Sequence, residues 1–327
     1  MRVLVTGGAG YVGSHAVRWL MQAGHEVWVY DDLSRGHAKA VPEGRLLRGS
    51  LGDEPRLIEA LRTHGIEAVM HFAAFTLVGE SVGDPLLYYR NNVCGSVSLL
   101  SAMRACDVWR LVFSSTTAIY GAPERQPISE EAPRQPINPY GTSKLMVELM
   151  LEDAARAYGF GYAALRYFNA AGASAAADLG EDHTPETHLI PIVLQVALGR
   201  QSHVTVFGDD YPTPDGTCVR DYVHVEDLAQ AHLLALERLE PGRGLHLNLG
   251  TGRGYSVREV IEACRRVTGR PICARIGPRR PGDPAALIAD PTRARQTLGW
   301  APEYTELDRI VETAWRWHQA HPDGYGR

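Results

Sequence analysis

Cysteines and long apolar runs are scarce in this sequence, and each scarcity excludes a class of protein. The five cysteines are an odd number, and no two of them stand in a Cys-x-x-Cys spacing, so they predict neither a zinc site nor a redox pair. They are typical of reduced thiols in a cytosol. No apolar stretch reaches the roughly 18 residues of a membrane span. The apolar run at residues 3–5 is too short for a signal peptide. We therefore expect a soluble, cytoplasmic protein with no membrane partner.

Positive charge is also in short supply. Lysine and arginine number 33 against 38 aspartates and glutamates, which gives a formal net charge of −5. No basic run could follow a phosphate backbone, so we expect no nucleic-acid partner. The thirteen histidines form no His-Glu-x-x-His pattern, and His183 and His188 stand five residues apart in a polar segment. We therefore expect no metal site.

What the sequence does have is a regular alternation of short apolar runs with longer amphipathic segments, typical of β-α-β units. We expect strands over residues 2–5, 26–30, 45–48, 68–72, 111–114 and 162–167. We expect helices over residues 12–21, 55–62, 86–104 and 140–157. This pattern predicts an α/β fold with a doubly wound parallel sheet of the Rossmann type.

The alternation loosens after Phe168, where we expect a second, smaller lobe of mixed α/β structure. The predicted division gives residues 1–168 to a dinucleotide-binding Rossmann domain, rejoined by about residues 222–250, and residues 169–327 to a substrate-binding lobe. No Gly/Ser-rich linker separates the two parts, so we expect them to pack closely.

The first strand runs directly into a glycine turn, with Gly7, Gly10 and Gly13 in a Gly-x-x-Gly-x-x-Gly spacing. A strand, a tight turn and a helix start together place free N–H groups and the positive end of the helix where a pyrophosphate can bind. The second strand ends at Asp31, and an acidic residue at this distance from the turn hydrogen-bonds the adenosine ribose and repels a 2′-phosphate. The sequence therefore predicts bound NAD rather than NADP.

Two further segments predict proton-transfer chemistry. Tyr140 and Lys144 stand four residues apart at the start of a long helical pattern, so they share one helix face. Bringing the pKa of a phenol from about 10 to 7 requires about 4 kcal/mol, much of which a nearby ammonium can supply. Hydroxyl residues, among them Thr116, close the fifth predicted strand at the sheet edge where ligands bind. These three residues form a set suited to the oxidation of an alcohol by NAD⁺.

The motifs GGAGYVGSH, SSTTAIYG, NPYGTSK, PETHLIP, FGDDYPTPDGTCVRDYVHVEDLA and RRPGDPA together resemble those of the extended short-chain dehydrogenase/reductases, and more narrowly the nucleotide-sugar 4-epimerases among them. The resemblance runs from Met1 to about Trp300. It implies a UDP-hexose substrate, with interconversion of UDP-galactose and UDP-glucose through transient oxidation at C4. It also implies a homodimer. In this reading Tyr140 removes the proton of the 4-hydroxyl, Thr116 hydrogen-bonds that oxygen, and Lys144 holds the nicotinamide ribose.

The resemblance also implies the remaining site residues. Those expected beside the dinucleotide, besides the glycines, Asp31, Tyr140 and Lys144, are Tyr11, Val12, Leu33, Ser34, Ser50, Leu51, Phe72, Ala73, Ala74, Asn92 and Phe168. Those expected at the nucleotide sugar, besides Thr116 and Tyr140, are Asn169, His188, Leu189, Phe207, Arg220, Arg280, Asp283 and Leu287. The two arginines are expected to bind the diphosphate, because a guanidinium matches phosphate oxygens in pairs. Alternatively, the arginines make surface ion pairs and His188 lies in a solvated loop.

Three positions depart from the pattern of the family. Ser50 stands where an acid usually contacts the adenine, a contact that Asp53 could replace. Thr76 stands where some members have a lysine. Leu287 stands where some members have a bulky tyrosine, so the pocket has room for an N-acetyl group, and we expect UDP-GalNAc and UDP-GlcNAc to be accepted too.

Other functions stay open at this point. A nucleotide-sugar epimerase for uronic acids or pentoses would share the same residues. A 4,6-dehydratase or decarboxylase is disfavoured, because such chemistry involves an acid just after the strand-end hydroxyl and here Thr117 and Ala118 follow. A non-catalytic NAD(H)-sensing protein has no need for Thr116, Tyr140 and Lys144 together.

Overall fold

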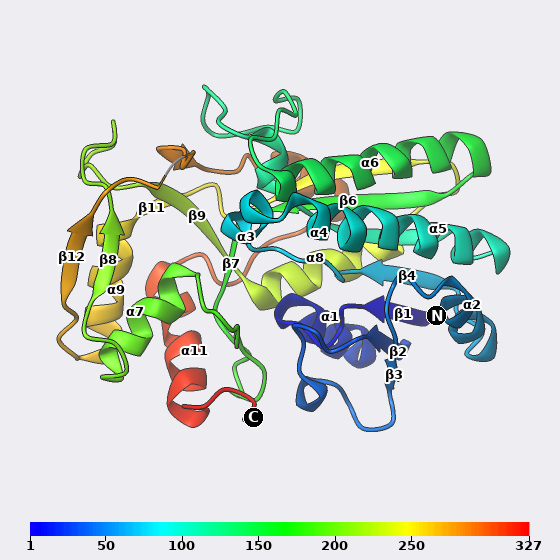
Figure 1. Cartoon of the computed structure of the whole chain (residues 1–327), viewed down its shortest axis with the longest axis horizontal. Coiled ribbons are helices and arrows are strands. Elements are labelled where there is room, and N and C mark those ends of the chain that lie inside the picture. The colour runs from blue at the N-terminus through cyan, green and yellow to red at the C-terminus, as the bar shows by residue number, and fades with distance from the viewer. Residues whose placement is uncertain (281, 327) are drawn as a thin grey trace.

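The computed structural model describes residues 1–280 and 282–326, and its largest element is a seven-stranded parallel sheet (Figure 1). In chain order its strands are β1 (Arg2–Thr6), β2 (Glu26–Asp31), β3 (Leu46–Arg48), β4 (Ala68–His71), β5 (Arg110–Thr116), β6 (Gly161–Tyr167) and β10 (Gly244–Leu249). Their order in the sheet is β3-β2-β1-β4-β5-β6-β10. The strand order reverses between β1 and β4, and such a switch point is where ligands bind in open α/β sheets.

Helices cover both faces of this sheet. Successive side chains of a strand point to opposite faces, so Val3 and Val5 enter one core and Leu4 enters the other, and all three are fully buried. The first core is completed by α1 (Tyr11–Gln22), α8 (Val225–Glu237) and α10 (Thr292–Leu298). The second is completed by α2 (Glu54–Thr63), α5 (Gly95–Ala105) and α6 (Pro139–Tyr158). The predicted doubly wound fold is therefore confirmed.

The helix predicted over residues 86–104 is present but is irregular in its middle. It runs without a break through α4 (Pro85–Tyr88), a π-helical turn (Tyr89–Cys94) and α5, and Tyr89 and Gly95 keep helical backbone angles. A short helix, α3 (Val78–Gly83), comes before them. The side chain of Asn92, within the π-helical turn, is hydrogen-bonded to the backbone of Phe75, a contact that periodicity in the sequence does not reveal.

The second lobe is of mixed type, as expected, and lies at one end of the molecule in Figure 1. Its strands are β7 (Asn169–Ala171), β8 (Val204–Phe207), β9 (Val219–His224), β11 (Gly254–Ser256), β12 (Ala274–Gly277) and β13 (Ala286–Leu287). β9 pairs antiparallel with β11 and parallel with β7 and β13, while β8 pairs parallel with β12. The core of this lobe lies among α7 (Leu189–Ala197), α9 (Val257–Thr268) and α11 (Leu307–Ala320).

The chain crosses between the two parts more than once. After the first strands of the second lobe, α8 packs on the large sheet and β10 joins its edge next to β6. α10 and Trp300 pack on the same core, which the sequence analysis did not anticipate. We propose a Rossmann domain of residues 1–168, rejoined by residues 225–249 and 292–300, with the second lobe formed from the rest. Among the residues that the structure describes, no helix is long and apolar enough to cross a membrane.

Candidate active site

The glycine turn connects β1 to α1. It lies where the strand order of the sheet reverses. Gly7 has a φ of +72°, and a Cβ atom there would lie 2.4 Å from the backbone nitrogen of Ala73. A Cβ atom at Gly13 would lie 2.3 Å from the carbonyl oxygen of Gly7. No larger residue fits these two positions without a shift of the backbone. α1 begins after Gly10 without a capping side chain, so its first N–H groups are available to an anion.

Asp31 ends β2 beside this turn. Its carboxylate accepts hydrogen bonds from the backbone N–H groups of Ala9 (3.1 Å) and Leu33 (2.8 Å). Burial raises the pKa of Asp31, whereas these two hydrogen bonds act to lower it. Leu33 adopts a positive φ of 63°, and the backbone N–H of Ser34 bonds to Asp32. The predicted acid and the two residues expected after it therefore form a compact turn next to the glycines.

The residues after β4 form the opposite wall of the turn. Phe72 and Ala73 donate their backbone N–H groups to the carbonyl oxygen of Thr6, and half-buried Ala74 follows them. Val12 packs against the adjacent core, as a structural residue would.

The region expected near the adenine contains Ser50 and Leu51. The carbonyl oxygen of Ser50 accepts a bond from Tyr30, and Leu51 is buried in the core beneath. Asp53 caps α2 by accepting a bond from the backbone N–H of Arg56. One oxygen of Asp53 is engaged in this cap, so only its other oxygen is left for the contact that the missing acid would make.

Tyr140, Thr116 and Lys144 meet where β5 and α6 approach each other. Tyr140 lies in the first turn of α6, which Asn138 caps, and its phenol lies near Thr116 at the end of β5. Lys144 lies one turn further along the helix and is 3% exposed. Its ammonium donates a hydrogen bond to the carbonyl oxygen of Ser114 (2.8 Å). The three residues predicted from sequence to act together are thus brought together.

The expected lowering of the Tyr140 pKa by Lys144 is absent from the described structure. Burial raises the pKa of Tyr140 well above its ordinary value, Tyr167 raises it further, and only the hydrogen bond from Thr116 acts to lower it. Burial also lowers the pKa of Lys144 to about 7, against the opposing effect of Glu148. The reason is geometric, because the ammonium is held by Ser114 and lies over the ring of Phe113. Burial therefore favours the neutral phenol of Tyr140, and positive charge entering the site would favour its ionised form.

A buried network beneath these residues was not predicted. Glu148 accepts hydrogen bonds from Ser115 (2.6 Å) and from two nitrogens of Arg166 (3.0 and 2.7 Å). Arg166 also donates to Tyr120, whose hydroxyl donates to Asn248 of β10. The signal was available, because Glu148 lies four residues after Lys144 on the same helix face.

Asn92 is buried, and its side chain holds two neighbouring segments together. It is 2% exposed, and its amide donates to the carbonyl oxygen of Phe75 and to the hydroxyl of Ser143 on α6. These bonds fix the segment after β4 against the helix that carries Tyr140.

Several residues expected at the nucleotide sugar converge on β9. Arg220 donates to Asp283 (3.1 Å) and stands in register with Leu287 of β13. The guanidinium of Arg280 lies 4.0 Å from the ring centre of Phe207. Leu287 packs on a small apolar cluster that includes Phe168. It therefore lies between β9, which carries Arg220, and the large sheet.

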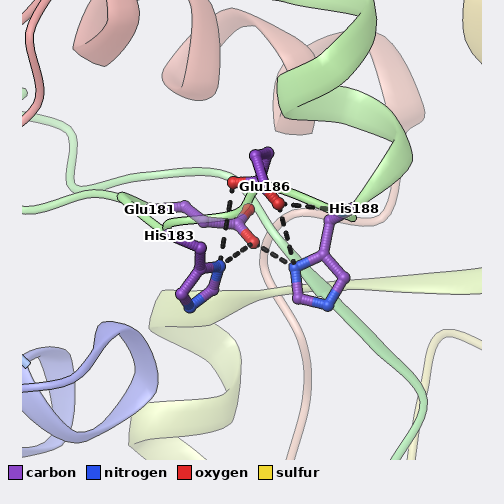
Figure 2. Close-up of side chains that lie close together, drawn as sticks. All are labelled: Glu181, His183, Glu186 and His188. Carbon is purple, nitrogen blue, oxygen red and sulfur yellow. Dashed lines mark hydrogen bonds and ion pairs between the residues drawn. The ribbon is translucent and has the colours of Figure 1, made fainter. Parts of the chain in front are cut away.

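The other sugar-side residues lie at the starts of their elements. Asn169 begins β7 and Leu189 begins α7. Tyr11 of the glycine turn donates its hydroxyl to the carbonyl oxygen of Gly172 (2.6 Å), which joins the two lobes. His188 directs its Nδ1 to the carboxylate of Glu181 (Figure 2). Its side chain is 47% exposed in the segment before α7, so both the solvated-loop reading and a contact with the nucleotide stay open.

Comparison with known proteins gives consistent matches over the whole chain. The sequence model of the NAD dependent epimerase/dehydratase family matches residues 3–250. A UDP-glucose 4-epimerase of Halalkalibacterium halodurans is 54% identical over 326 residues, covering 99% of this chain and 98% of the relative. The crystal structure of UDP-glucose 4-epimerase from Bifidobacterium longum with NAD⁺ and UDP has a TM-score of 0.94 and 39% identity, covering 99% of this chain and 100% of that one. The structure of the UDP-Glc/GlcNAc 4-epimerase from Campylobacter jejuni has a TM-score of 0.85 and 40% identity, covering 98% and 99%.

Proposed function

Because this chain belongs to the NAD dependent epimerase/dehydratase family, we propose that it is a UDP-glucose 4-epimerase. It interconverts UDP-galactose and UDP-glucose by transient oxidation of the sugar at C4, with NAD bound throughout. The observation that carries this assignment is the meeting of Thr116, Tyr140 and Lys144 beside the glycine turn at the switch point of the sheet.

The residues present fit an NAD molecule. The free N–H groups at the start of α1 match a pyrophosphate, and the buried carboxylate of Asp31 matches a pair of ribose hydroxyls. When bound, NAD⁺ supplies a hydride acceptor and one positive charge. That charge favours the ionised phenol, which supports the role of Tyr140 as the base in the holoenzyme although burial raises its pKa in the described structure.

The protein's own part in the reaction is to move one proton and to bind the diphosphate of the substrate more firmly than its hexose. Tyr140 accepts the proton of the 4-hydroxyl, Thr116 holds the same oxygen, and Lys144 orients the nicotinamide ribose. Arg220 and Arg280 bind the diphosphate. Inversion at C4 requires the keto sugar to turn over between the two hydride transfers, so the hexose must be held less firmly than the diphosphate.

Conversion without added cofactor tests this function. Purified protein incubated with UDP-galactose should produce UDP-glucose, with the products separated by chromatography. No conversion, even with NAD⁺ supplied, would contradict the assignment and direct attention to uronic acid and pentose nucleotides.

The sugar range is set, in our proposal, by Leu287. We expect the wild-type protein to convert UDP-GalNAc as well as UDP-galactose, because a leucine leaves more space than a tyrosine beside Phe168 and Arg220. Leu287→Tyr should lower kcat/KM for UDP-GalNAc by about 100-fold, roughly 3 kcal/mol, and change that for UDP-galactose little.

The control for this prediction is Leu86→Tyr, at a position 58% exposed on α4. This variant should leave kcat/KM unchanged for both UDP-GalNAc and UDP-galactose. Wild-type activity on UDP-GalNAc and UDP-GlcNAc below a thousandth of that on UDP-galactose would refute the proposed sugar range.

We also propose a homodimer that packs through α5 and α6. Supporting this, Val97 of α5 and Met146 and Leu149 of α6 are each more than 40% exposed, although they are apolar. Sedimentation velocity distinguishes a dimer from a monomer.

The cytoplasm is the proposed location of the protein. This proposal is supported by the five cysteines, which are all free thiols.

A further inference from the structure

Four side chains from one short segment converge before the start of α7 (Figure 2). They are Glu181, His183, Glu186 and His188, and one nitrogen or oxygen atom of each lies within 4.8 Å of the others. Both histidines turn the same ring nitrogen, Nδ1, toward the same oxygen of Glu181. The function proposed above uses none of the four in this arrangement.

The spacing of these atoms matches a four-coordinate metal site. Zinc binds histidine nitrogen and carboxylate oxygen at about 2.0–2.2 Å, so the ligand atoms of a tetrahedral site lie about 3.3–3.5 Å apart. The Nδ1 atom of His183 lies 3.2 Å from Oε1 of Glu181 and 3.7 Å from Oε2 of Glu186, and that of His188 lies 3.8 Å from Oε1 of Glu186. One ligand atom of each residue lies within 4.8 Å of the others, so the four side chains need to draw closer to surround one ion.

The charge of the cluster also matches a divalent cation. The side chains of Glu181 and Glu186 are 4% and 8% exposed, and a buried carboxylate needs a compensating charge. Without a metal, protons on the histidines must supply it.

Compensation by protons puts two positive rings side by side. The ring centres of His183 and His188 lie 5.3 Å apart. A single ion among the four atoms neutralises both carboxylates and removes this repulsion, because neutral histidines are metal ligands.

We propose that Glu181, His183, Glu186 and His188 form a structural binding site for one Zn²⁺ ion. The mixed set of two nitrogens and two oxygens favours zinc over magnesium or calcium, which take oxygen ligands. This proposal departs from the expectation that the chain has no metal site. That expectation rested on known sequence motifs, and the spacing Glu-x-His-x-x-Glu-x-His is not one of them.

The position of the site indicates what the ion stabilises. The carbonyl oxygen of Glu181 accepts a bond from Trp317 of α11 (3.1 Å), and that of Asp182 accepts one from His37, in the segment after β2 (2.9 Å). The ring of His183 also meets the edge of Tyr11 in the glycine turn. The ion therefore fixes a segment that contacts both lobes next to the cofactor turn.

Metal removal and return test the proposal on the full-length protein. After treatment with a chelator and dialysis, Zn²⁺ alone should bind with a stoichiometry of about one per chain. Its return should raise the melting temperature, because an ion that binds only the folded state stabilises it. Co²⁺ in its place should give the visible absorption of a tetrahedral site.

A matched pair of variants separates this site from adventitious binding. His183→Ala should weaken Zn²⁺ binding about 100-fold or more. Removal of a residue that only hydrogen-bonds a metal ligand already lowers metal affinity about 10- to 100-fold. His203→Ala, at a partly exposed histidine outside the cluster, should bind Zn²⁺ as the wild type does. Equal binding by both variants, or a wild-type melting temperature unchanged by the chelator and by Zn²⁺, would overturn the proposal. The wild-type measurements hold even if His183→Ala fails to fold, and none of them depends on epimerase activity.

Discussion

Tyr140→Phe should lower kcat for the conversion of UDP-galactose by about 10³-fold, within the 10²- to 10⁴-fold range typical of general acid–base catalysis. The substitution removes the phenol hydroxyl near Thr116 while leaving the half-buried ring in place at the start of α6. The loss should therefore fall on kcat, with NAD retained as measured from the absorbance of the purified protein.

Tyr158→Phe is the matched control on the same helix, since Tyr158 ends α6 and is 47% exposed. It should keep wild-type activity. If Tyr140→Phe lowered kcat less than tenfold, Tyr140 would not be the proton acceptor, and the non-catalytic NAD-sensing alternative would regain support.

Glu148→Ala should lower the free energy of unfolding by about 3–5 kcal/mol, because it leaves the guanidinium of Arg166 buried without its partner. The two side chains are 0% and 2% exposed and share two hydrogen bonds. Although burial raises the pKa of Glu148, the hydrogen bonds from Arg166 bring it below its ordinary value, so the carboxylate is charged at neutral pH. Urea unfolding followed by circular dichroism measures the change.

Glu152→Ala controls for the loss of a glutamate on the same helix. Glu152 is 22% exposed and pairs with Arg134 at the surface, so its removal should cost about 1 kcal/mol or less. A double change of Glu148 and Arg166 to apolar residues should recover part of the loss, because no buried charge is then left unpaired. Equal effects of Glu148→Ala and Glu152→Ala would contradict the role assigned to the buried pair.

The large sheet could be predicted from the sequence because its strands are buried on both faces. Uninterrupted apolar runs such as that of β4 mark such strands within one or two residues. β5 extends further than predicted, from Arg110 to Thr116, because its polar end still pairs with β6 as far as Tyr167. The strands of the second lobe were not predicted individually, since β7 and β13 have three and two residues and depend on pairing with β9.

The site could be predicted in part, for a similar reason. Local patterns place Tyr140 and Lys144 on one face and the glycines in one turn, and both arrangements are present. Contacts that join distant segments have no local signal. The bond of Lys144 to Ser114 and the pair of Arg166 with Glu148 follow from the packing of β5, β6 and α6. The lowering of the Tyr140 pKa by Lys144 stays a prediction for the enzyme with NAD bound.

The position of β10 at the edge of the sheet has a consequence for biosynthesis. While the chain emerges from the ribosome, the outer edge of β6 has no neighbour until residues 244–249 appear, long after the glycine turn is complete. An open strand edge invites pairing with other chains. Asn248, which completes the bonds of Tyr120, also arrives with β10. The nascent Rossmann domain therefore stays aggregation-prone until the first part of the second lobe and β10 have been translated, and its dependence on chaperones should be greatest in that interval.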